Sequence, residues 1–437
     1  MNKNYTVAFH TLGCKVSQYE TEAIREALLS RGFTEKPFDD VADAYIINTC
    51  TVTAESDRKS RQMIRRAKAK NPDAAVVVTG CYSEVSPDEC AAIAGVTHIF
   101  GSYGKMKIPD AVEEYLLRRE KGEQPPQYRD ASDLDKAPFE KMCVRGAPRT
   151  RAYVKIEDGC ECRCTYCAIP SARGRVRSKS PDDVLVELRI LLENGTREVV
   201  LTGIETASYG RDLGDTSLID LLERIDRELP TLRVRLGSLT PELVTEDFVS
   251  RAARLHVLLP HFHLSMQSGS DSVLRLMRRR YNTRQALLGF ERLRKHFPDV
   301  QLTTDMMVGF PGESDENFEE TLDFVSRARF LQMHVFIYSE RKGTVAATMP
   351  NAVPKEVRKE RSQRLIALGQ RLTQEILSET VLKAKPLSVI FETFDGKTAV
   401  GHSASFIEVR TETSQDIRGE VISVTPVSAG GGYLICK

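Results

Sequence analysis

The sequence predicts a multi-domain α/β protein in three parts: an N-terminal open parallel α/β sheet, a central partial (β/α)6 barrel and a C-terminal small antiparallel β-barrel. The chain has 437 residues, enough for two or three domains, and its 41% hydrophobic content can fill their cores. Over most of the length, β-rich runs alternate with amphipathic helical stretches, which is typical of parallel sheets covered by helices. In the last segment, apolar and polar residues alternate around glycine-containing turns, which indicates antiparallel β structure.

The first part, residues 1–117, contains three apolar runs that each end in a cysteine. The runs are YTVAFHTLGC, AYIINTC and AAVVVTGC, and they place Cys14, Cys50 and Cys81 at their ends. Their spacing of roughly 30 residues or more is the size of one βαβ step. Because parallel strands bring their carboxyl ends to one edge of a sheet, we expect the three thiols to converge. One such cysteine alone would be interpreted as a buried structural thiol, whereas three at equivalent strand ends favour ligation.

Residues 118–150 are expected to form a linker, because the sequence loses its periodicity there and gathers Pro, Gly and charged residues. The next part, residues 151–382, holds six β-rich runs: AYVKIEDGC, REVVLTGIE, LRVRLGSL, HFHLSMQ, VQLTTDMMVGF and LQMHVFIYS. One intervening helix is expected to start at Pro181, with Ser180 as its N-cap and Gly195 at its end. Because the βα pattern stops at six units, we expect a partial barrel.

A further helix from Lys355 leads to the C-terminal part, residues 383–437, in which we expect the small β-barrel. No apolar run approaches the length of a membrane span, and the N-terminus resembles a strand more than a signal peptide. We therefore expect a cytoplasmic protein without a membrane partner. In that compartment ten cysteines are not expected to form a disulfide framework, so the clustered ones indicate metal or redox chemistry.

The densest cysteine cluster is DGCECRCTYCAIP, on the loop that leaves the first barrel strand. Cys160, Cys164 and Cys167 stand as C-x3-C-x2-C, and three thiolates on one loop can hold three corners of a [4Fe–4S] cube. The fourth iron then has an open position for a small molecule. The alternative is zinc with Cys162 as the fourth ligand, which is disfavoured because structural zinc sites place two ligand pairs farther apart. Tyr166 is expected to flank the cluster and its ligand.

This loop, DGCECRCTYCAIPSARGRVRSKSP, resembles the cluster loop of radical S-adenosylmethionine (SAM) enzymes, and specifically of the methylthiotransferases. HTLGCKVSQYETE, INTCTVTAESDRKSRQ and TGCYSE resemble the domain in which that family holds a second cluster on three cysteines, and the C-terminal part resembles the RNA-binding TRAM barrel. LGCKV, INTCTVT and VTGCY are most similar to the threonylcarbamoyladenosine tRNA methylthiotransferases. Two positions depart from the family pattern: Cys162 and Ser17 stand where Asn is common. We expect Cys162 to be a packed thiol, because it lies too near Cys164 in sequence for good ligand geometry.

The resemblance implies two [4Fe–4S] clusters and SAM as cofactors. Cys160, Cys164 and Cys167 would hold the cluster that binds SAM and, on reduction, cleaves it to a 5′-deoxyadenosyl radical. Cys14, Cys50 and Cys81 would hold an auxiliary cluster that carries the sulfur to be transferred. Residues expected to hold SAM lie beside the cluster or at carboxyl ends of barrel strands. For any single one of them a structural role in a turn is as plausible as SAM binding. These candidates are Tyr166, Thr202, Gly203, Glu205, Ser238, Gln267, Ser268 and Asp305.

Two basic runs are candidate RNA contacts, although such runs are commonly solvated loops or helix faces. They comprise Arg173, Arg175, Arg177 and Lys179 after the cluster loop, and Arg278, Arg279 and Arg280 farther on. The global charge indicates no partner, since 62 Lys and Arg nearly balance 61 Asp and Glu. A base that is modified on its edge must be exposed, which favours an unstacked anticodon-loop nucleotide.

Together these features predict a tRNA methylthiotransferase that acts on carbon 2 of N6-threonylcarbamoyladenosine at position 37 of tRNA, beside the anticodon. Methylthiolation of isopentenyl adenosine, or of a ribosomal-protein aspartate, is an alternative within the family. A non-catalytic iron–sulfur protein that binds RNA or senses redox state is an alternative from another class. The expected partners are the tRNA anticodon stem-loop, an electron donor such as flavodoxin or ferredoxin, and a sulfur donor, with the protein itself a monomer.

Overall fold

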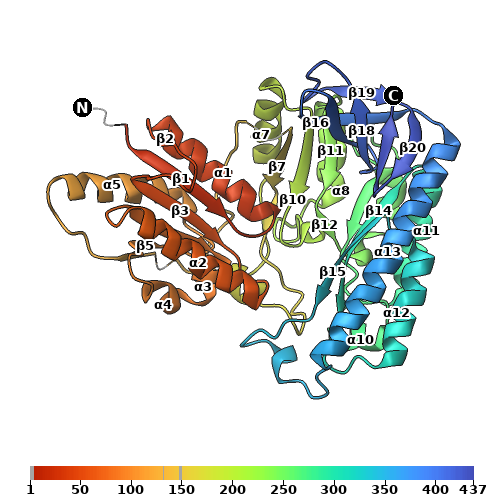
Figure 1. The fold of residues 1–437 in the computed structure, drawn as a ribbon, viewed down its shortest axis with the longest axis horizontal. Coiled ribbons are helices and arrows are strands. Elements are labelled where there is room, and N and C mark those ends of the chain that lie inside the picture. Colours follow the sequence, from red (N-terminus) through yellow and green to blue (C-terminus); the bar gives the residue numbers. More distant parts are fainter. Residues whose placement is uncertain (1–3, 131, 147–149) are drawn as a thin grey trace. The chain divides into compact units, whose positions relative to one another are not determined.

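The computed structural model describes residues 4–130, 132–146 and 150–437 (Figure 1). Its contacts divide the chain into two compact units. Unit 1 comprises Met1–Arg145, Tyr153–Lys179 and Ser339–Thr344, and unit 2 comprises Gly146–Ala152, Ser180–Tyr338 and Val345–Lys437. This division differs from the predicted domain boundaries, because the cysteine loop after the first barrel strand packs with the N-terminal part. No helix in the described ranges combines the length and the apolar character needed to cross a lipid bilayer.

Unit 1 is built on a six-stranded sheet with the order β2-β1-β3-β4-β5-β6, in which every neighbouring pair is parallel. The strands are β1 (Thr6–Thr11), β2 (Thr34–Glu35), β3 (Ala44–Thr49), β4 (Ala75–Gly80), β5 (His98–Ile99) and β6 (Tyr128–Arg129). The predicted open parallel sheet is therefore confirmed. β3 and β4 are buried along their whole length, as expected of central strands covered on both faces.

Helices cover both faces of this sheet: α1 (Lys15–Ser30), α2 (Ala54–Lys70), α3 (Cys81–Val85), α4 (Pro87–Ala91) and α5 (Ile108–Glu120). Side chains alternate along the strands, so Tyr45 and Val76 pack with Ile64 of α2 on one face. Ile46 and Val77 point to the other face, where they join apolar side chains of α1 and α5. The two cores hold the strands rigidly and fix the sheet edge where the cysteines lie.

The cysteine loop of unit 1 is closed at its base by a short antiparallel pair, β8 (Glu157–Asp158) with β9 (Arg177–Ser178). β7 (Arg151–Lys155) precedes it and α6 (Ile169–Arg173) lies within it. Residues 118–130 and 132–145 of the predicted linker at 118–150 lie in unit 1, where Met142 and Val144 pack against Tyr19. The predicted domain boundaries stay a prediction. Positions 131 and 147–149 of that stretch lie outside the described residues.

Each of the six predicted β-rich runs contains a strand. In unit 2 these strands are β10 (Glu198–Thr202), β11 (Arg233–Leu236), β12 (Ser238–Leu239), β13 (His261–Leu264), β14 (Gln301–Val308) and β15 (Gln332–Ile337). β10 pairs with β11, and β12, β13, β14 and β15 pair in order, all in parallel. One predicted run is split into β11 and β12 at Gly237. The parallel βα architecture is thus confirmed, and its description as a partial barrel stays a prediction.

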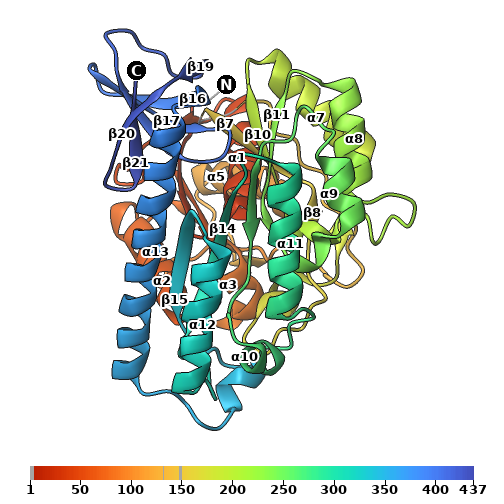
Figure 2. The ribbon, with the colours of Figure 1, turned by 90° about the vertical axis from the view of Figure 1, so that its right-hand side faces the viewer.

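The helices of unit 2 are α7 (Pro181–Glu193), α8 (Leu218–Glu228), α9 (Glu246–Ala252), α10 (Asp271–Leu276), α11 (Thr283–His296), α12 (Asp315–Ala328) and α13 (Lys355–Lys383). Figure 2 shows α11, α12 and α13 side by side along the β14 and β15 strands. α7 begins as predicted, since the Asp183 N–H donates to Ser180 Oγ at 3.1 Å. Gly195 follows it with φ +89°, which suits a helix end.

The C-terminal part is a curled six-stranded half-barrel with the order β19-β16-β17-β18-β21-β20. Its strands are β16 (Leu387–Phe394), β17 (Thr398–Ser403), β18 (Glu408–Glu412), β19 (Val421–Val424), β20 (Pro426–Gly430) and β21 (Tyr433–Cys436). The prediction of an all-antiparallel barrel is wrong in one respect, because β18 and β21 pair in parallel. Residues of α13 such as Leu377 complete the apolar core of the half-barrel, so the helix and the sheet form one body within unit 2.

Candidate functional site

The three N-terminal cysteines lie at one edge of the unit 1 sheet. Cys50 directly follows β3, Cys81 directly follows β4, and Cys14 caps the start of α1 after β1. These strands are neighbours, and the register pairs Thr49 with Gly80, so the two chain ends leave the sheet together. The backbone at Gly13, next to Cys14, lies close to Cys50, because a Cβ on Gly13 would be 3.3 Å from the Cβ of Cys50. The predicted convergence of the three thiols is confirmed.

The electrostatics of this cysteine group depend on burial. Burial, together with the nearby Cys81 and Cys14, raises the pKa of the Cys50 thiol to about 11. Burial also raises the pKa of Cys81, although Arg173 acts in the opposite direction. The two buried cysteines are therefore protonated at neutral pH until a metal replaces their protons, and metal binding here is expected to release protons.

Gly80 makes the close approach of the two strand ends possible. Its φ is +104°, which side chains rarely adopt, and an added Cβ would lie 2.5 Å from both Asn48 Oδ1 and Thr49 O. Asn48 in turn donates from Nδ2 to the Ser17 carbonyl at 3.0 Å, which ties β3 to α1. The TGC sequence at this point thus provides the backbone geometry as well as the thiol.

The second cysteine group lies on the loop between β8 and α6. Gly159 allows the loop to close, because a Cβ there would lie 1.9 Å from the Arg175 carbonyl oxygen. The Cys160 N–H donates to the Gly174 carbonyl at 3.1 Å, and the Cys167 N–H donates to the Cys164 carbonyl at 3.1 Å.

Backbone N–H groups also point at two sulfurs of this loop. The Cys162 N–H donates to Cys160 Sγ at 3.5 Å, and the Ile169 N–H donates to Cys167 Sγ at 3.4 Å. Such donors favour the thiolate form that an iron–sulfur cluster requires. The half-buried Tyr166 lies on the same loop.

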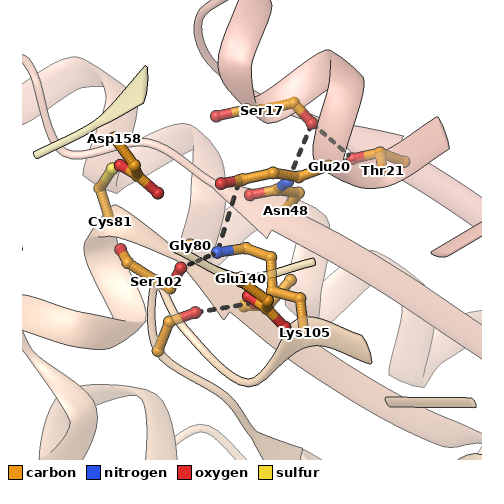
Figure 3. A network of polar contacts seen from close by, with 12 residues as sticks. Ser17, Glu20, Thr21, Asn48, Gly80, Cys81, Ser102, Lys105, Glu140 and Asp158 are labelled. Atoms are coloured by element: carbon orange, nitrogen blue, oxygen red, sulfur yellow. Dashed lines mark hydrogen bonds and ion pairs between the residues drawn. The ribbon is translucent and has the colours of Figure 1, made fainter. Parts of the chain in front are cut away.

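A group of buried charged side chains, here called the buried ion network, adjoins the N-terminal cysteines in unit 1 (Figure 3). Its members are Glu20, Lys105, Lys155, Asp158, Arg173 and Arg177. Burial would raise the pKa of Glu20, but the charges of Arg173, Lys105 and Lys155 hold it well below its usual range. Sequence reasoning missed this network, because its members come from segments far apart in the sequence, and Arg173 and Arg177 were interpreted as RNA contacts.

Part of the predicted RNA surface is buried in the structure. Arg173, Arg177 and Lys179 are 0%, 2% and 4% exposed, so their side chains cannot contact an RNA phosphate in this structure. Arg173 belongs to the buried ion network, Arg177 donates to the Arg173 carbonyl at 2.7 Å, and Lys179 donates to the Met142 carbonyl at 2.9 Å. Their burial therefore disfavours phosphate contact by these three residues, and an RNA contact here stays a prediction. Arg175 is exposed and stays a candidate.

The second basic run lies after α10 in unit 2. Arg278 and Arg280 are exposed, so both stay candidates for phosphate contact. Arg279 is half-buried and donates to the Tyr281 hydroxyl at 3.0 Å and to the Ser265 carbonyl at 3.3 Å. Its contacts are those of a side chain that supports the local fold.

The predicted SAM residues of unit 2 fall into two groups. Thr202 ends β10, with Gly203 and Glu205 in the loop that follows, and Ser238 begins β12. A Cβ on Gly237 would lie 3.2 Å from Thr202 Oγ1, so β10 and β12 come close where these residues lie. Their contact with SAM stays a prediction.

The other group lies where β13 and β14 adjoin. Gln267 has φ +68°, and its backbone N–H donates to the Asp305 carbonyl at 2.8 Å, while Ser268 is buried beside it. The Asp305 carboxylate contacts His263 Nε2 and His334 Nδ1, each at 3.1 Å. Burial would raise the pKa of Asp305, but these hydrogen bonds lower it well below its usual range. Both histidines were absent from the sequence-based candidates, since single histidines carry no spacing signal.

Two family models match the chain. The radical SAM superfamily matches residues 154–325, and the uncharacterized protein family UPF0004 matches residues 6–101. In solved structures, the cobalamin- and [4Fe–4S]-bound radical S-adenosylmethionine methyltransferase TsrM from Kitasatospora setae has a TM-score of 0.55, with 79% of this chain and 77% of that chain covered. At 15% identity this similarity shows the fold alone.

Curated relatives are more similar. Threonylcarbamoyladenosine tRNA methylthiotransferase MtaB of Bacillus subtilis is 40% identical, over 98% of this chain and 95% of the relative. The tRNA-2-methylthio-N(6)-dimethylallyladenosine synthase of Acetivibrio thermocellus is 31% identical, over 97% of this chain and 88% of the relative. With matches of this length and both cysteine groups in place, the chain belongs to the family of radical SAM tRNA methylthiotransferases.

Proposed function

We propose that this protein replaces the hydrogen on carbon 2 of N6-threonylcarbamoyladenosine at position 37 of tRNA by a methylthio group. The observation that carries the proposal is the presence of two separate cysteine trios, one of which converges at a sheet edge. A single SAM-cleaving cluster needs only one trio, so the second indicates a further task, which here is sulfur delivery. The higher identity to the threonylcarbamoyladenosine enzyme, 40% against 31%, favours that substrate over dimethylallyl adenosine.

The N-terminal trio fits an auxiliary [4Fe–4S] cluster. The three thiols lie close enough to influence one another's protonation, and Cys50 and Cys81 are buried, so water is kept from much of the site. A cationic side chain lies in contact, since Arg173 Nε is 3.2 Å from Cys81 Sγ. Three thiolate donors leave one iron free for a ligand from outside the protein.

The loop trio fits the SAM-binding [4Fe–4S] cluster that the radical SAM family implies. Cys160, Cys164 and Cys167 lie on one loop whose base is fixed by β8 and β9, and the backbone supplies N–H donors to two of the sulfurs. When bound, the cluster on this loop supplies the electron that cleaves SAM to a 5′-deoxyadenosyl radical, and the auxiliary cluster supplies sulfur.

The protein's own residues would orient the reactants and exclude water. The fully buried strands β3 and β4 shield the inner side of the N-terminal trio. In unit 2, hydrogen bonds hold Gln267 and Asp305 in place, so groups of this kind can position SAM without rearranging. We assign Tyr166, Thr202, Gly203, Glu205, Ser238 and Ser268 to the same task.

For substrate binding we assign RNA contacts to the C-terminal half-barrel, as a TRAM-like domain, and to the exposed Arg175, Arg278 and Arg280. Phosphate contacts of this kind fix the register of the RNA, while the flipped base is held at the reacting centre. An electron donor such as flavodoxin or ferredoxin, a sulfur donor, a monomeric state and a cytoplasmic location complete the proposal.

The test is nucleoside analysis of total tRNA from a deletion strain by mass spectrometry. We expect methylthio-threonylcarbamoyladenosine to disappear and its unmodified precursor to accumulate, with restoration by the wild-type gene. A gene carrying Cys14→Ala, Cys50→Ala and Cys81→Ala should not restore it. Loss of the methylthio derivative of isopentenyl adenosine would instead identify the other tRNA substrate, and a changed ribosomal-protein mass would identify the aspartate reaction. If none of these changes, a non-catalytic iron–sulfur protein is indicated.

A further inference from the structure

Arg173 contacts both a cysteine of the N-terminal trio and the buried ion network. Its Nε lies 3.2 Å from Cys81 Sγ, and its Nη1 donates to Glu20 Oε1 at 2.5 Å. Nη1 also lies 3.3 Å from Asp158 Oδ2, close to the start of the second cysteine loop. The side chain is completely buried, so one guanidinium group joins a predicted cluster ligand to two buried carboxylates.

The buried ion network carries more positive than negative charge. Its cations are Lys105, Lys155, Arg173 and Arg177, and its carboxylates are Glu20 and Asp158. Glu140 lies near the lysines and accepts the Met106 N–H at 2.9 Å, and the cations still outnumber the carboxylates when it is counted as ionised. Uncompensated buried charge is costly, so the network favours an anion next to it. Cys81 is the cysteine that Arg173 contacts, and a cluster with thiolate ligands would supply that negative charge.

We propose that Arg173 is a positioning residue for the auxiliary cluster: its N–H···S contact fixes the Cys81 sulfur and raises the reduction potential of the cluster. This inference rests on the proposed function. Reduction adds one negative charge to the cluster, and a fixed cation within hydrogen-bond distance stabilises the reduced form more than the oxidised form. Hydrogen bonds to sulfur and local net charge are established controls of iron–sulfur potentials, and both act strongly where water is excluded.

The contact geometry distinguishes Arg173 from the other cations of the network. Lys155 donates to Glu20 at 3.0 Å and to Asp158 at 3.1 Å. Lys105 donates to the Ser102 carbonyl at 2.6 Å and lies 3.4 Å from Glu20 (Figure 3). Each balances a carboxylate, whereas Arg173 does so and also contacts a sulfur. Lys155→Gln is therefore a matched control, since it removes one buried charge and leaves the N–H···S contact in place.

The experiment uses full-length protein that carries Cys160→Ala, Cys164→Ala and Cys167→Ala, so that only the N-terminal cluster remains. Arg173→Gln, Arg173→Lys and Lys155→Gln are each added to this background. After anaerobic reconstitution, iron is counted and the cluster is titrated with a chemical reductant while its absorbance and electron paramagnetic resonance are recorded. Glu20 and Asp158 keep Lys105, Lys155 and Arg177 as partners in Arg173→Gln, so the fold is expected to persist.

Arg173→Gln should lower the ratio of reduced to oxidised cluster at fixed potential by at least tenfold, which corresponds to about 59 mV for one electron. Arg173→Lys keeps the charge and should recover part of the shift, while Lys155→Gln should change the ratio less than Arg173→Gln. An unchanged ratio with about four irons bound, or an equal effect of Lys155→Gln, would overturn the inference and leave the proposed function intact. A background protein that binds no iron would overturn both.

Discussion

Replacing the buried Glu20 by Gln is predicted to destabilise unit 1 by removing the carboxylate that compensates three cations. Glu20 lies 2.5 Å from Arg173, 3.0 Å from Lys155 and 3.4 Å from Lys105, and all four side chains are at most 1% exposed. The substitution keeps the shape of the side chain and removes its charge. Breaking a buried ion pair from one side costs about 3–5 kcal/mol, because the remaining charge stays buried without its partner.

The matched control is Glu113→Gln on α5. Glu113 pairs with Arg31 at 3.2 Å, but these side chains are 44% and 33% exposed, so water screens the pair. Exposed pairs of this kind contribute about 0–1 kcal/mol. The two variants therefore make the same chemical change in two different dielectric environments, and the difference between them measures the effect of burial.

Hydrogen exchange followed by mass spectrometry can measure the effect strand by strand. Peptides from β3 and β4 report on unit 1, and a peptide from β14 serves as an internal reference in unit 2. A loss of about 3 kcal/mol corresponds to exchange that is about 100-fold faster in the unit 1 strands, since each 1.4 kcal/mol is about tenfold. If Glu20→Gln accelerated β3 and β4 no more than Glu113→Gln does, or accelerated β14 equally, the reasoning would be refuted.

Three further predictions concern the cluster edge and the sheet beside it. Replacing Cys14, Cys50 and Cys81 by Ala should leave about half of the iron bound by reconstituted wild-type protein, and should preserve 5′-deoxyadenosine formation while abolishing methylthiolation; continued tRNA modification would contradict the assignment. Gly80→Ala places a Cβ 2.5 Å from Asn48 Oδ1 and from Thr49 O, which displaces the strand end that holds Cys81. Iron analysis of this variant should therefore show the same loss of about half of the iron, although all three N-terminal cysteines are present. Burial lowers the pKa of His98 to about 4 in the folded state. Between about pH 6.5 and pH 4 only the unfolded chain binds the proton, so the free energy of unfolding of unit 1 should fall by about 3 kcal/mol across this range. His98→Gln should remove this pH dependence in urea unfolding, and an unchanged pH profile would show that another group is responsible.

The sequence alone determined the features that depend on local pattern. Apolar runs that end in cysteine predicted the parallel strands and the meeting of Cys14, Cys50 and Cys81, because strand direction and sheet edge follow from the βα repeat. The C-x3-C-x2-C spacing placed Cys160, Cys164 and Cys167 on one loop in the same way. The alternation of strands and helices likewise predicted the parallel architecture of unit 2.

Only the tertiary structure decided which charges are buried and what they contact. Arg173 stands in a basic run that predicts a solvated RNA surface, yet its partner Glu20 is 153 residues away in sequence, and no periodic pattern links the two. The pairing of β18 with β21, and the packing of Met142 against Tyr19, are long-range choices of the same kind. Periodicity reports which face of an element is apolar, whereas a buried charge is stable only where distant segments bring compensating groups to it, so its location emerges with the fold.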